Sequence, residues 1–458
     1  MVYDVAIIGG GPGGYAAALY AHNFGLSVAL VERELVGGTC LHRGCIPAKS
    51  WLQTAEVFAE VAHAAEFGVI SSPPTLDWTV ALARKNGIVD RLHGGLTGLL
   101  KQRKVDVFEG SGRLAASGIV YVAMHDGSTQ RIEARTVILA TGSVPRGIPG
   151  YEIDGYRIVT SDHALDWTSR PNRVAIIGAG AIGLEFASML TDVGSTVHLF
   201  EMMDQVVPGL EPQASRLLTR ALAARGVDIH TATGVDAAVI TDTGVTVPFG
   251  GRAVEVDVVL VAVGRAPVVE GIGVGATRAV IDRGFVRVDP STMQTAEPGL
   301  YAVGDIVAGT PQLAHAGFAE GIAAITHIAT GTTAPPDYRV IPLIVYSDPE
   351  VASVGLTEAQ ATEAGYRVEK HSHGFAGVAR ALIQGRAEGT VKLVVEKDGP
   401  ILGATVVGPA AGEIIHELMY MVGWEALPSE AAAFIHAHPT LAEAIGETLM
   451  AAAGRSLH

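Results

Sequence analysis

The chain has only two cysteines, Cys40 and Cys45, and both lie in the segment GGTCLHRGCIPAKSWL at 37–52. On a regular helix, residues five apart exceed the Cα separation of about 4.4–6.8 Å that a disulfide tolerates. Gly44 relaxes the backbone and Pro47 is typical of a first helical turn, so we expect Cys45 near the start of a helix. The helix dipole favours a thiolate there. A bridge closing so short a loop is labile, which indicates redox chemistry.

Two other interpretations of this segment stay open at this point. The cysteines could be a pair of reduced core residues. Alternatively, Cys40, His42 and Cys45 could bind a metal ion, although tetrahedral sites usually pair two such spacings and the chain has no further cysteine. We assign no metal site.

Length and composition limit the class of protein. A chain of 458 residues implies about three domains. Glycine, at 56 residues, is well above its usual share of about 7%, which indicates tight turns or backbone packed against a ligand. The net charge of -15 argues against a nucleic-acid partner. An acidic surface would suit a basic protein partner, and solubility alone explains it equally well.

The start of the sequence and its hydrophobic pattern predict the cellular compartment of the protein. A strand-like run over 3–8 begins at once, without the pattern of a signal peptide, and no run of about 18 apolar residues suggests a membrane span. We therefore expect a cytoplasmic protein with no membrane partner. In that reducing compartment a disulfide is catalytic rather than structural.

One motif occurs twice. Residues 5–32 and 174–201 each predict an apolar strand, a glycine-rich turn, a helix and a second strand ending in an acid. Such glycines let the backbone approach a pyrophosphate at a helix N-terminus, and the acid binds ribose hydroxyls. The corresponding residues are Gly9, Gly11, Gly14, Gly25 and Glu32 in the first copy and Gly178, Gly180, Gly183, Gly194 and Glu201 in the second. The sequence thus predicts two dinucleotide sites, the alternative being two glycine-rich turns without ligands.

The acid of the second copy bears on the choice of nucleotide. Glu201 repels a 2'-phosphate, and the following Met202 and Met203 offer no arginine to bind one. We therefore expect NAD rather than NADP at this site.

The cysteine segment resembles the redox-disulfide motif of the flavin-dependent pyridine nucleotide-disulfide oxidoreductases. Its LHRGCIPAK wording is most similar to members that oxidise dihydrolipoyl groups. The segment TAEPGLYAVGDI at 295–306 resembles the second flavin motif of this family, and HAHPTLAEAIGE at 436–447 resembles its catalytic His-Glu pair. The resemblance covers essentially the whole chain.

The resemblance implies an α/β fold with two Rossmann-like dinucleotide-binding domains, for FAD and NAD, and an α+β C-terminal dimerisation domain. The domains would be 1–145 (FAD, first part), 146–265 (NAD), 266–340 (FAD and central, second part) and 341–458 (interface). The protein would be a homodimer.

The resemblance also implies residue roles. Substrate would attack Cys40, Cys45 would lie nearer the flavin, and His438 would be the base that Glu443 orients. The FAD residues would be Gly9, Gly11, Gly14, Glu32, Gly38, Thr39, Lys49, Gly112, Thr141, Gly142, Asp305 and Ala314. The NAD residues would be Gly178, Gly180, Ile182, Gly183, Glu185, Glu201, Val235 and Gly264. Plainer interpretations are a helix cap for Asp305, a solvated charge for Lys49 and a structural role for His438.

The implied reaction oxidises a dihydrolipoyl group carried by an acyltransferase or carrier protein of a 2-oxoacid dehydrogenase or glycine cleavage system. In the family the histidine comes from the other subunit, and the lysine pairs with a glutamate at the position of Glu185. The chain departs from the family at Ala48, at Val268 and at the His42-Arg43 pair. Alternatives are a reductase of a mycothiol- or glutathione-like disulfide, or a non-catalytic NADH-sensing or complex-docking subunit.

Overall fold

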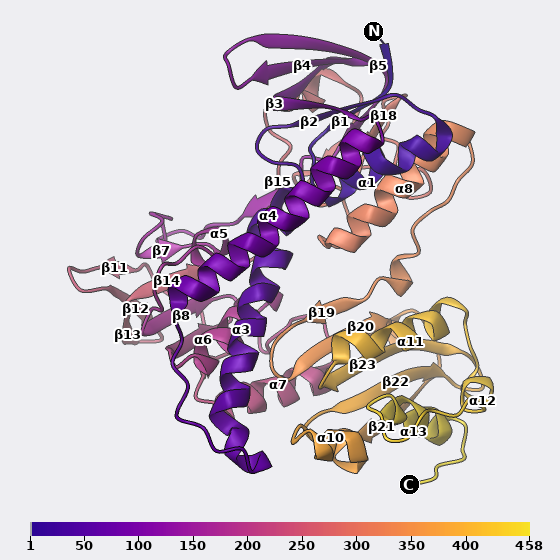
Figure 1. Ribbon diagram of the computed structural model, residues 1–458. Helices are drawn as coiled ribbons and strands as arrows, with labels where there is room; N and C mark the ends of the chain where they lie inside the picture. The colour runs from indigo at the N-terminus through magenta and orange to yellow at the C-terminus, as the bar shows by residue number, and fades with distance from the viewer. Residues whose placement is uncertain (1) are drawn as a thin grey trace. The chain divides into compact units, whose positions relative to one another are not determined.

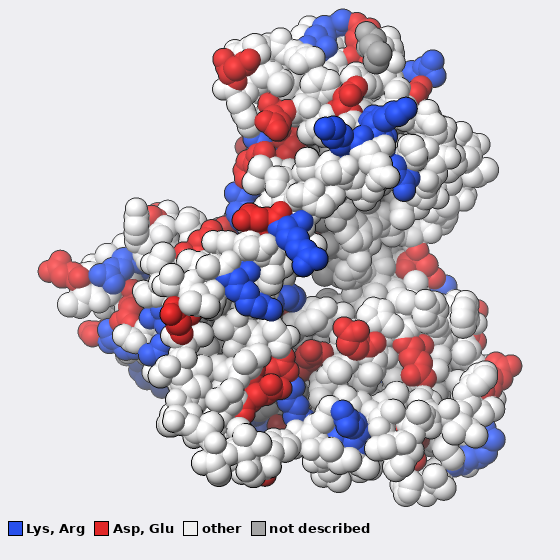
Figure 2. Space-filling view, viewed as in Figure 1, with Lys and Arg blue, Asp and Glu red and all other residues white. Residues whose placement is uncertain are grey.

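The computed structural model describes residues 2–458 and divides into two compact units. The first unit holds the N-terminal segment up to Ser50, Val80–Arg146 and Arg265–Tyr338. The second holds Trp51–Thr79, Gly147–Gly264 and Arg339–His458. No helix within residues 2–458 is long and apolar enough to cross a membrane. On the face that Figure 2 presents, Lys and Arg side chains are interspersed with Asp and Glu.

The first unit is built on a six-stranded sheet in which the central strands are parallel. Strand β1 lies between β2 and β5 and is parallel to both. Strand β2 is also parallel to β3, and β5 is also parallel to β18. Strand β4 is antiparallel to both β3 and β5. The strands are β1 (Val2–Ile8), β2 (Val28–Glu32), β3 (Asp106–Ala116), β4 (Ile119–Met124), β5 (Thr129–Leu139) and β18 (Leu300–Ala302). The first copy of the repeated motif thus folds as predicted.

Both faces of this sheet are buried, because successive strand residues point to opposite sides. Val5 and Ile7 pack into the core beneath the helices, and Ala6 and Ile8 into the core on the other face. Helices α1 (Pro12–Ala21) and α8 (Ala314–Thr330) lie side by side over the first face (Figure 1). The smaller elements are η1 (His22–Phe24), α2 (Gly38–Arg43), β6 (Ser143–Pro145), β15 (Arg265–Pro267), η3 (Val274–Ala276), β16 (Ile281–Asp282) and β17 (Phe285–Val286).

Two long helices, α3 (Cys45–His63) and α4 (Trp78–Gln102), each contribute residues to both units. In the second unit, the indole of Trp51 lies 4.4 Å from that of Trp78, between ring centroids. Their ring nitrogens donate hydrogen bonds to the carbonyls of Leu165 and Trp167. The short helix η2 (Ala64–Phe67) follows α3.

The second unit contains a parallel sheet with strand order β10-β9-β8-β14-β7. Its strands are β7 (Ile158–Val159), β8 (Arg173–Ile177), β9 (Thr196–Phe200), β10 (Asp228–His230) and β14 (Val258–Val261), and its helices are α5 (Ser161–Ala164), α6 (Ala181–Asp192) and α7 (Pro212–Ala224). An antiparallel meander packs against one face through Val247 and Phe249; it comprises β11 (Val239–Ile240), β12 (Val245–Phe249) and β13 (Arg252–Val256). The second copy of the motif therefore also folds as predicted.

The C-terminal part of the second unit is a five-stranded antiparallel sheet with the order β19-β20-β23-β22-β21. Helix α11 packs on β20 and β23, and α13 packs on β21 and β22. The elements are η4 (Tyr338–Val340), β19 (Leu343–Val345), β20 (Glu350–Gly355), α9 (Glu358–Glu363), β21 (Val368–Gly374), η5 (Phe375–Gly377), α10 (Ala379–Ile383), β22 (Thr390–Glu396), β23 (Ile401–Gly408), α11 (Ala411–Gly423), α12 (Pro428–Ala431) and α13 (Glu443–Ala452). The four domain segments expected from the sequence stay a prediction.

Candidate active site

The two cysteines stand on either side of a break between helices. Helix α2 ends at Arg43, Gly44 has non-helical angles, and α3 begins at Cys45, as expected. A Cβ on Gly44 would lie 2.9 Å from the Thr39 carbonyl oxygen, so this close approach requires glycine. Both cysteines are partly buried thiols, and Cys40 hydrogen-bonds to Cys45. The break is what brings two sulfurs five residues apart into contact.

The surroundings of Cys40 favour its protonated form. The hydrogen bond with Cys45 and burial both raise the pKa of Cys40 above its ordinary value, while the Lys49 ammonium acts in the opposite direction. Because a thiolate rather than a thiol attacks a disulfide, proton transfer has to accompany chemistry at this pair.

Tyr15 is a neighbour of the dithiol that the sequence analysis did not single out. Burial, and then the charges of Cys40 and Cys45, raise the pKa of its phenol to about 12. Its ring packs against Phe318, with the centroids 5.6 Å apart. The signal in the sequence was its position directly after Gly14, on the helix that the first glycine motif opens.

The first glycine motif forms a tight turn that leaves space in front of a helix N-terminus. A Cβ on Gly9 would lie 2.2 Å from the Ala140 carbonyl oxygen, and one on Gly14 would lie 1.9 Å from the Gly9 carbonyl oxygen. Gly11 is the N-cap residue of α1, and a Cβ there would meet only the Gly38 Cα, at 4.0 Å. This open cradle fits the pyrophosphate of a dinucleotide.

The acid of the first motif is fixed at the end of β2. Glu32 accepts hydrogen bonds from the backbone nitrogens of Gly10, at 2.7 Å, and Glu34, at 2.8 Å. Each carboxylate oxygen has a second lone pair, so Glu32 can still accept from ribose hydroxyls. These residues fit FAD at this motif.

The other residues expected at FAD all lie in the same unit. Thr141 donates a hydrogen bond to the Val268 carbonyl at 2.6 Å, and Gly142 takes a φ of +70°. A Cβ on Gly112 would lie 3.0 Å from side chains of Ile8 and Val31, so close strand packing explains this glycine without a ligand. Gly38 and Thr39 begin α2, Lys49 lies on α3, and Ala314 is the first residue of α8.

Asp305 is oriented by two residues that the sequence analysis missed. Its carboxylate accepts a hydrogen bond from the Ser143 hydroxyl. The Arg265 guanidinium donates to both the hydroxyl and the carbonyl oxygen of Ser143, each at 2.7 Å. Ser143 and Arg265 each follow a strand-like run and a glycine, VILATG at 137–142 and VLVAVG at 259–264, but this shared position does not show that the two residues meet Asp305. Asp305 therefore has specific polar partners rather than a role as a helix cap.

The second glycine motif repeats the geometry of the first. A Cβ on Gly178 would lie 2.5 Å from the Ala262 carbonyl oxygen, and one on Gly183 would lie 1.9 Å from the Gly178 carbonyl oxygen. Gly180 is the N-cap residue of α6, and a Cβ there would meet no atom within 4 Å, which leaves a cradle of the same kind. Glu201 accepts from the backbone nitrogens of Ala179, at 2.8 Å, and Met203, at 2.9 Å. The motif fits NAD.

The remaining NAD residues lie in the second unit. Ile182 and Glu185 are on α6, Val235 packs against the core between sheet and meander, and Gly264 takes a φ of +103°. Glu185 is buried and accepts a hydrogen bond from the Tyr346 backbone nitrogen at 3.2 Å. Its pairing with Lys49 would join residues of different units and stays a prediction.

The His-Glu pair expected from the sequence is formed. His438 Nδ1 lies 2.8 Å from Glu443 Oε1, and Glu443 Oε2 accepts from the Thr440 backbone nitrogen at 2.8 Å. Although slight burial opposes it, the hydrogen bonds from Thr440 and His438 hold the pKa of Glu443 below its usual range. The His438 side chain is 72% exposed. The ring is therefore oriented by a carboxylate on one nitrogen and open on the other side, as a general base requires.

A second His-Glu pair lies two residues earlier. His436 Nε2 is 2.8 Å from Glu417 Oε1, and this hydrogen bond raises the pKa of His436 above its ordinary value. Unlike His438, His436 is largely buried. Both pairs belong to the second unit and the dithiol to the first, so their cooperation stays a prediction.

Comparisons with known proteins agree with this arrangement. Residues 3–321 match the family described as pyridine nucleotide-disulphide oxidoreductase, and residues 341–449 match its dimerisation domain. Dihydrolipoyl dehydrogenase of Bacillus subtilis (strain 168) is 39% identical over 471 aligned positions, covering 100% of this chain and 99% of the relative. Dihydrolipoyl dehydrogenase of Zymomonas mobilis is 38% identical over 463 positions, covering 100% and 99%. The crystal structure of LpdA from Mycobacterium tuberculosis has a TM-score of 0.92 at 27% identity, covering 98% of this chain and 99% of that one.

Proposed function

The chain belongs to the pyridine nucleotide-disulphide oxidoreductase family, and from this premise we propose that it oxidises a dihydrolipoyl group and reduces NAD. The observation that carries the proposal is a Cys40 and Cys45 dithiol, in contact across a helix break, in a chain 39% identical over its full length to a dihydrolipoyl dehydrogenase. The net reaction converts one dihydrolipoyl dithiol and NAD⁺ into the lipoyl disulfide, NADH and a proton.

The chain's own residues supply the thiol chemistry. With the Cys40 and Cys45 pair oxidised, His438 takes the proton of a substrate thiol while Glu443 stabilises the imidazolium. The substrate thiolate attacks Cys40 Sγ, the bond between Cys40 and Cys45 breaks, and Cys45 leaves as a thiolate. The second substrate thiol then displaces Cys40 from the mixed disulfide, which releases the lipoyl disulfide and leaves both cysteines reduced.

Two dinucleotides complete the electron path. Bound FAD would supply two-electron redox chemistry between the reduced cysteines and the nicotinamide of bound NAD. Gly9, Gly11, Glu32 and Asp305 would hold the FAD, and Gly178, Gly180 and Glu201 would hold the NAD. Of the residues beside the dithiol, Lys49 acts to lower the pKa of Cys40, whereas Tyr15 has its own pKa raised by burial and by the two cysteines.

The partners follow from the chemistry. A dihydrolipoyl group arrives on a carrier, and we infer a lipoylated acyltransferase or carrier protein of a 2-oxoacid dehydrogenase or glycine cleavage system. We infer a homodimer that shares its active sites, formed through 341–458, because residues 341–449 match a dimerisation domain. The cytoplasm, a reducing compartment, is the location in which a dithiol of this kind cycles.

A comparison of substrates tests the proposal. Purified holoenzyme should oxidise free dihydrolipoamide with NAD at a kcat/KM at least about a hundredfold above that for NADH-driven reduction of glutathione or mycothiol disulfide. A higher rate with either disulfide would assign a small-disulfide reductase. No turnover of any of the three, in protein that carries FAD, would favour a sensing or docking subunit.

A further inference from the structure

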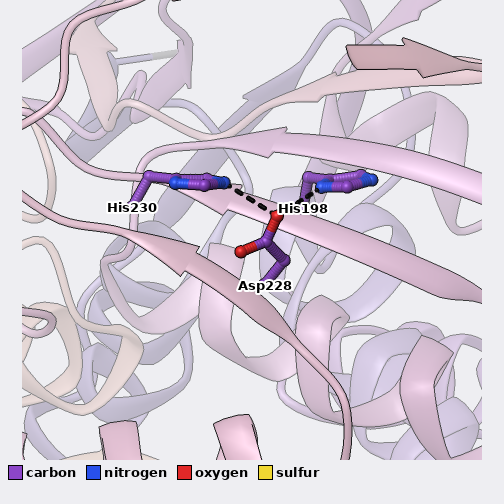
Figure 3. A group of neighbouring side chains, drawn as sticks. All are labelled: His198, Asp228 and His230. Atoms are coloured by element: carbon purple, nitrogen blue, oxygen red, sulfur yellow. Dashed lines mark hydrogen bonds and ion pairs between the residues drawn. The ribbon is translucent and has the colours of Figure 1, made fainter. Parts of the chain in front are cut away.

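Three side chains of types that can coordinate a metal ion lie close together on the parallel sheet of the second unit. His198 is on β9, and Asp228 and His230 are on the neighbouring strand β10. His198 and Asp228 are partners in the parallel register, and His230 lies two residues beyond Asp228. Because strand side chains alternate between faces, all three project from one face of the sheet, as Figure 3 shows. None of them belongs to the active site described above.

The spacing of the three side chains suits a bound cation. Asp228 Oδ2 lies 2.9 Å from His198 Nδ1 and 2.9 Å from His230 Nε2, and Figure 3 shows the carboxylate between the two rings. All three ligand atoms lie within 4.8 Å of one another. An ion about 2.1 Å from each ligand holds neighbouring ligands about 3.0–3.4 Å apart. Both Asp-His distances are already close to this range, so only the two rings need to approach each other.

The surroundings hold the site in place and leave it accessible. The His230 ring stacks on Phe200, with centroids 4.9 Å apart and an interplanar angle of 17°, and it also packs against Phe249. The side chains of His198 and His230 are 20% and 13% exposed, whereas that of Asp228 is 52% exposed. An ion can therefore enter beside the carboxylate, and water can fill its remaining positions.

The charge of the carboxylate also suits a cation. Aspartate side chains ordinarily carry a negative charge at neutral pH, so this group of ligands includes one anionic oxygen. Among the residues that the structure describes, no other group of three or more His, Cys, Asp or Glu side chains brings its ligand atoms this close together.

We propose that His198, Asp228 and His230 form a binding site for one divalent first-row transition-metal ion, such as Zn²⁺ or Cu²⁺. Two imidazole nitrogens and one carboxylate oxygen favour these ions over Mg²⁺ and Ca²⁺, which prefer oxygen ligands alone. The competing arrangement is a hydrogen-bonded cluster, in which both rings donate to Asp228 and no ion binds. The two arrangements differ in what occupies the space between the rings, so a metal titration separates them.

Calorimetric titration with Zn²⁺ tests the proposal in untagged, FAD-loaded protein. The parent carries Cys40→Ser and Cys45→Ser, because the dithiol would itself bind the ion. We expect one Zn²⁺ per chain. His198→Gln, Asp228→Asn and His230→Gln should each weaken binding by about tenfold or more. His63→Gln is the matched control, since His63 hydrogen-bonds only to the Ala59 carbonyl and should leave the Zn²⁺ affinity unchanged.

Electron paramagnetic resonance and thermal melts test the same site independently of calorimetry. Electron paramagnetic resonance of the parent with one equivalent of Cu²⁺ should show coupling to two imidazole nitrogens, and each histidine variant should lose one. Zn²⁺ should raise the Tm of the parent and of His63→Gln by more than it raises that of the three site variants at the same Zn²⁺ concentration, and the Tm values of the variants without Zn²⁺ show that they fold. Zn²⁺ binding that fails to saturate one site per chain, or that the three substitutions leave unchanged, would mean a hydrogen-bonded cluster only and would overturn the proposal.

Discussion

His438 Nδ1 is held 2.8 Å from Glu443 Oε1, at the first turn of the C-terminal helix α13. The backbone nitrogen of Thr440 donates to the other carboxylate oxygen, so the carboxylate cannot turn away without losing a second hydrogen bond. The hydrogen bond to Nδ1 therefore fixes one tautomer of His438 and leaves Nε2 available to a substrate thiol.

Removing either member of this pair should slow the dithiol reaction. We expect His438→Gln to lower kcat with dihydrolipoamide by about 10²–10⁴-fold, and Glu443→Gln to lower it less, since the base remains but loses its orientation. Steady-state rates measure both effects. Glu447→Gln is the matched control, because Glu447 is on the same helix and pairs with His458 instead. Equal losses in Glu443→Gln and Glu447→Gln would argue against a specific role for Glu443.

The preference for NAD should depend on Glu201. A carboxylate fixed by the Ala179 and Met203 amides repels a 2'-phosphate, so Glu201→Ala should lower the ratio of kcat/KM for NAD to that for NADP by about tenfold or more. Asp204→Asn, an exposed acid three residues later, should leave the ratio unchanged. A wild-type protein that prefers NADP would contradict the assignment outright.

Alanine substitutions at two glycines of the second motif should have different effects, one on stability and the other on NAD affinity. In Gly183→Ala the new Cβ would meet the Gly178 carbonyl 1.9 Å away, so the turn cannot form and the Tm should fall whether or not NAD is present. In Gly180→Ala the Cβ points into open space, so the NAD-free protein should keep its free energy of unfolding within about 0.5 kcal/mol while its affinity for NAD drops. Thermal melts and NAD titrations of both variants measure the contrast. A Gly180→Ala protein with normal NAD affinity would mean that the cradle does not bind the pyrophosphate.

The His436 and Glu417 pair should make stability depend on pH. The pKa of His436 is raised in the folded protein, so the pair stabilises the fold fully below the unfolded histidine pKa of about 6.5. This contribution is lost as the pH rises through the folded pKa. Glu417→Gln should therefore lower stability by about 0.5–1 kcal/mol near pH 6 and by less at pH 9.

Melting temperatures across pH 6–9 measure this difference. The control is Glu413→Gln, a change of an exposed acid on the same helix α11. A loss of Tm in Glu417→Gln that is the same at every pH would show that packing, rather than the charge of His436, accounts for it.

The sequence was sufficient to predict those features of the site whose residues lie close together along the chain. The two glycine turns and the position of Cys45 at a helix start involve residues a few positions apart, so local chemistry predicted them. The pairing of His438 with Glu443 was predicted by the resemblance to the family, carried by a segment of the same short length. The relay from Arg265 through Ser143 to Asp305 could not be predicted in the same way. Its members come from three segments that only the folded sheet brings together.

The same limit explains the other residues that were missed. His198 and Asp228 are partners only because β9 and β10 pair in one register, and a shift of one residue would place them on opposite faces. Tyr15 lies beside the dithiol because α1 and α2 both begin near the end of a sheet strand. The linear sequence marks Tyr15 as a residue of the helix after the first glycine turn, but it does not show that Tyr15 meets the dithiol or that His198 meets Asp228.

Strand β10 is the last strand of its sheet and is only three residues long. An unpaired strand edge can recruit a strand from another molecule, and proteins limit this risk by keeping such edges short and charged. Asp228 at its first position and His230 at its last supply polar side chains at that margin. The shortness of this strand and its polar side chains are the features by which proteins limit pairing of an exposed edge with a strand of another molecule.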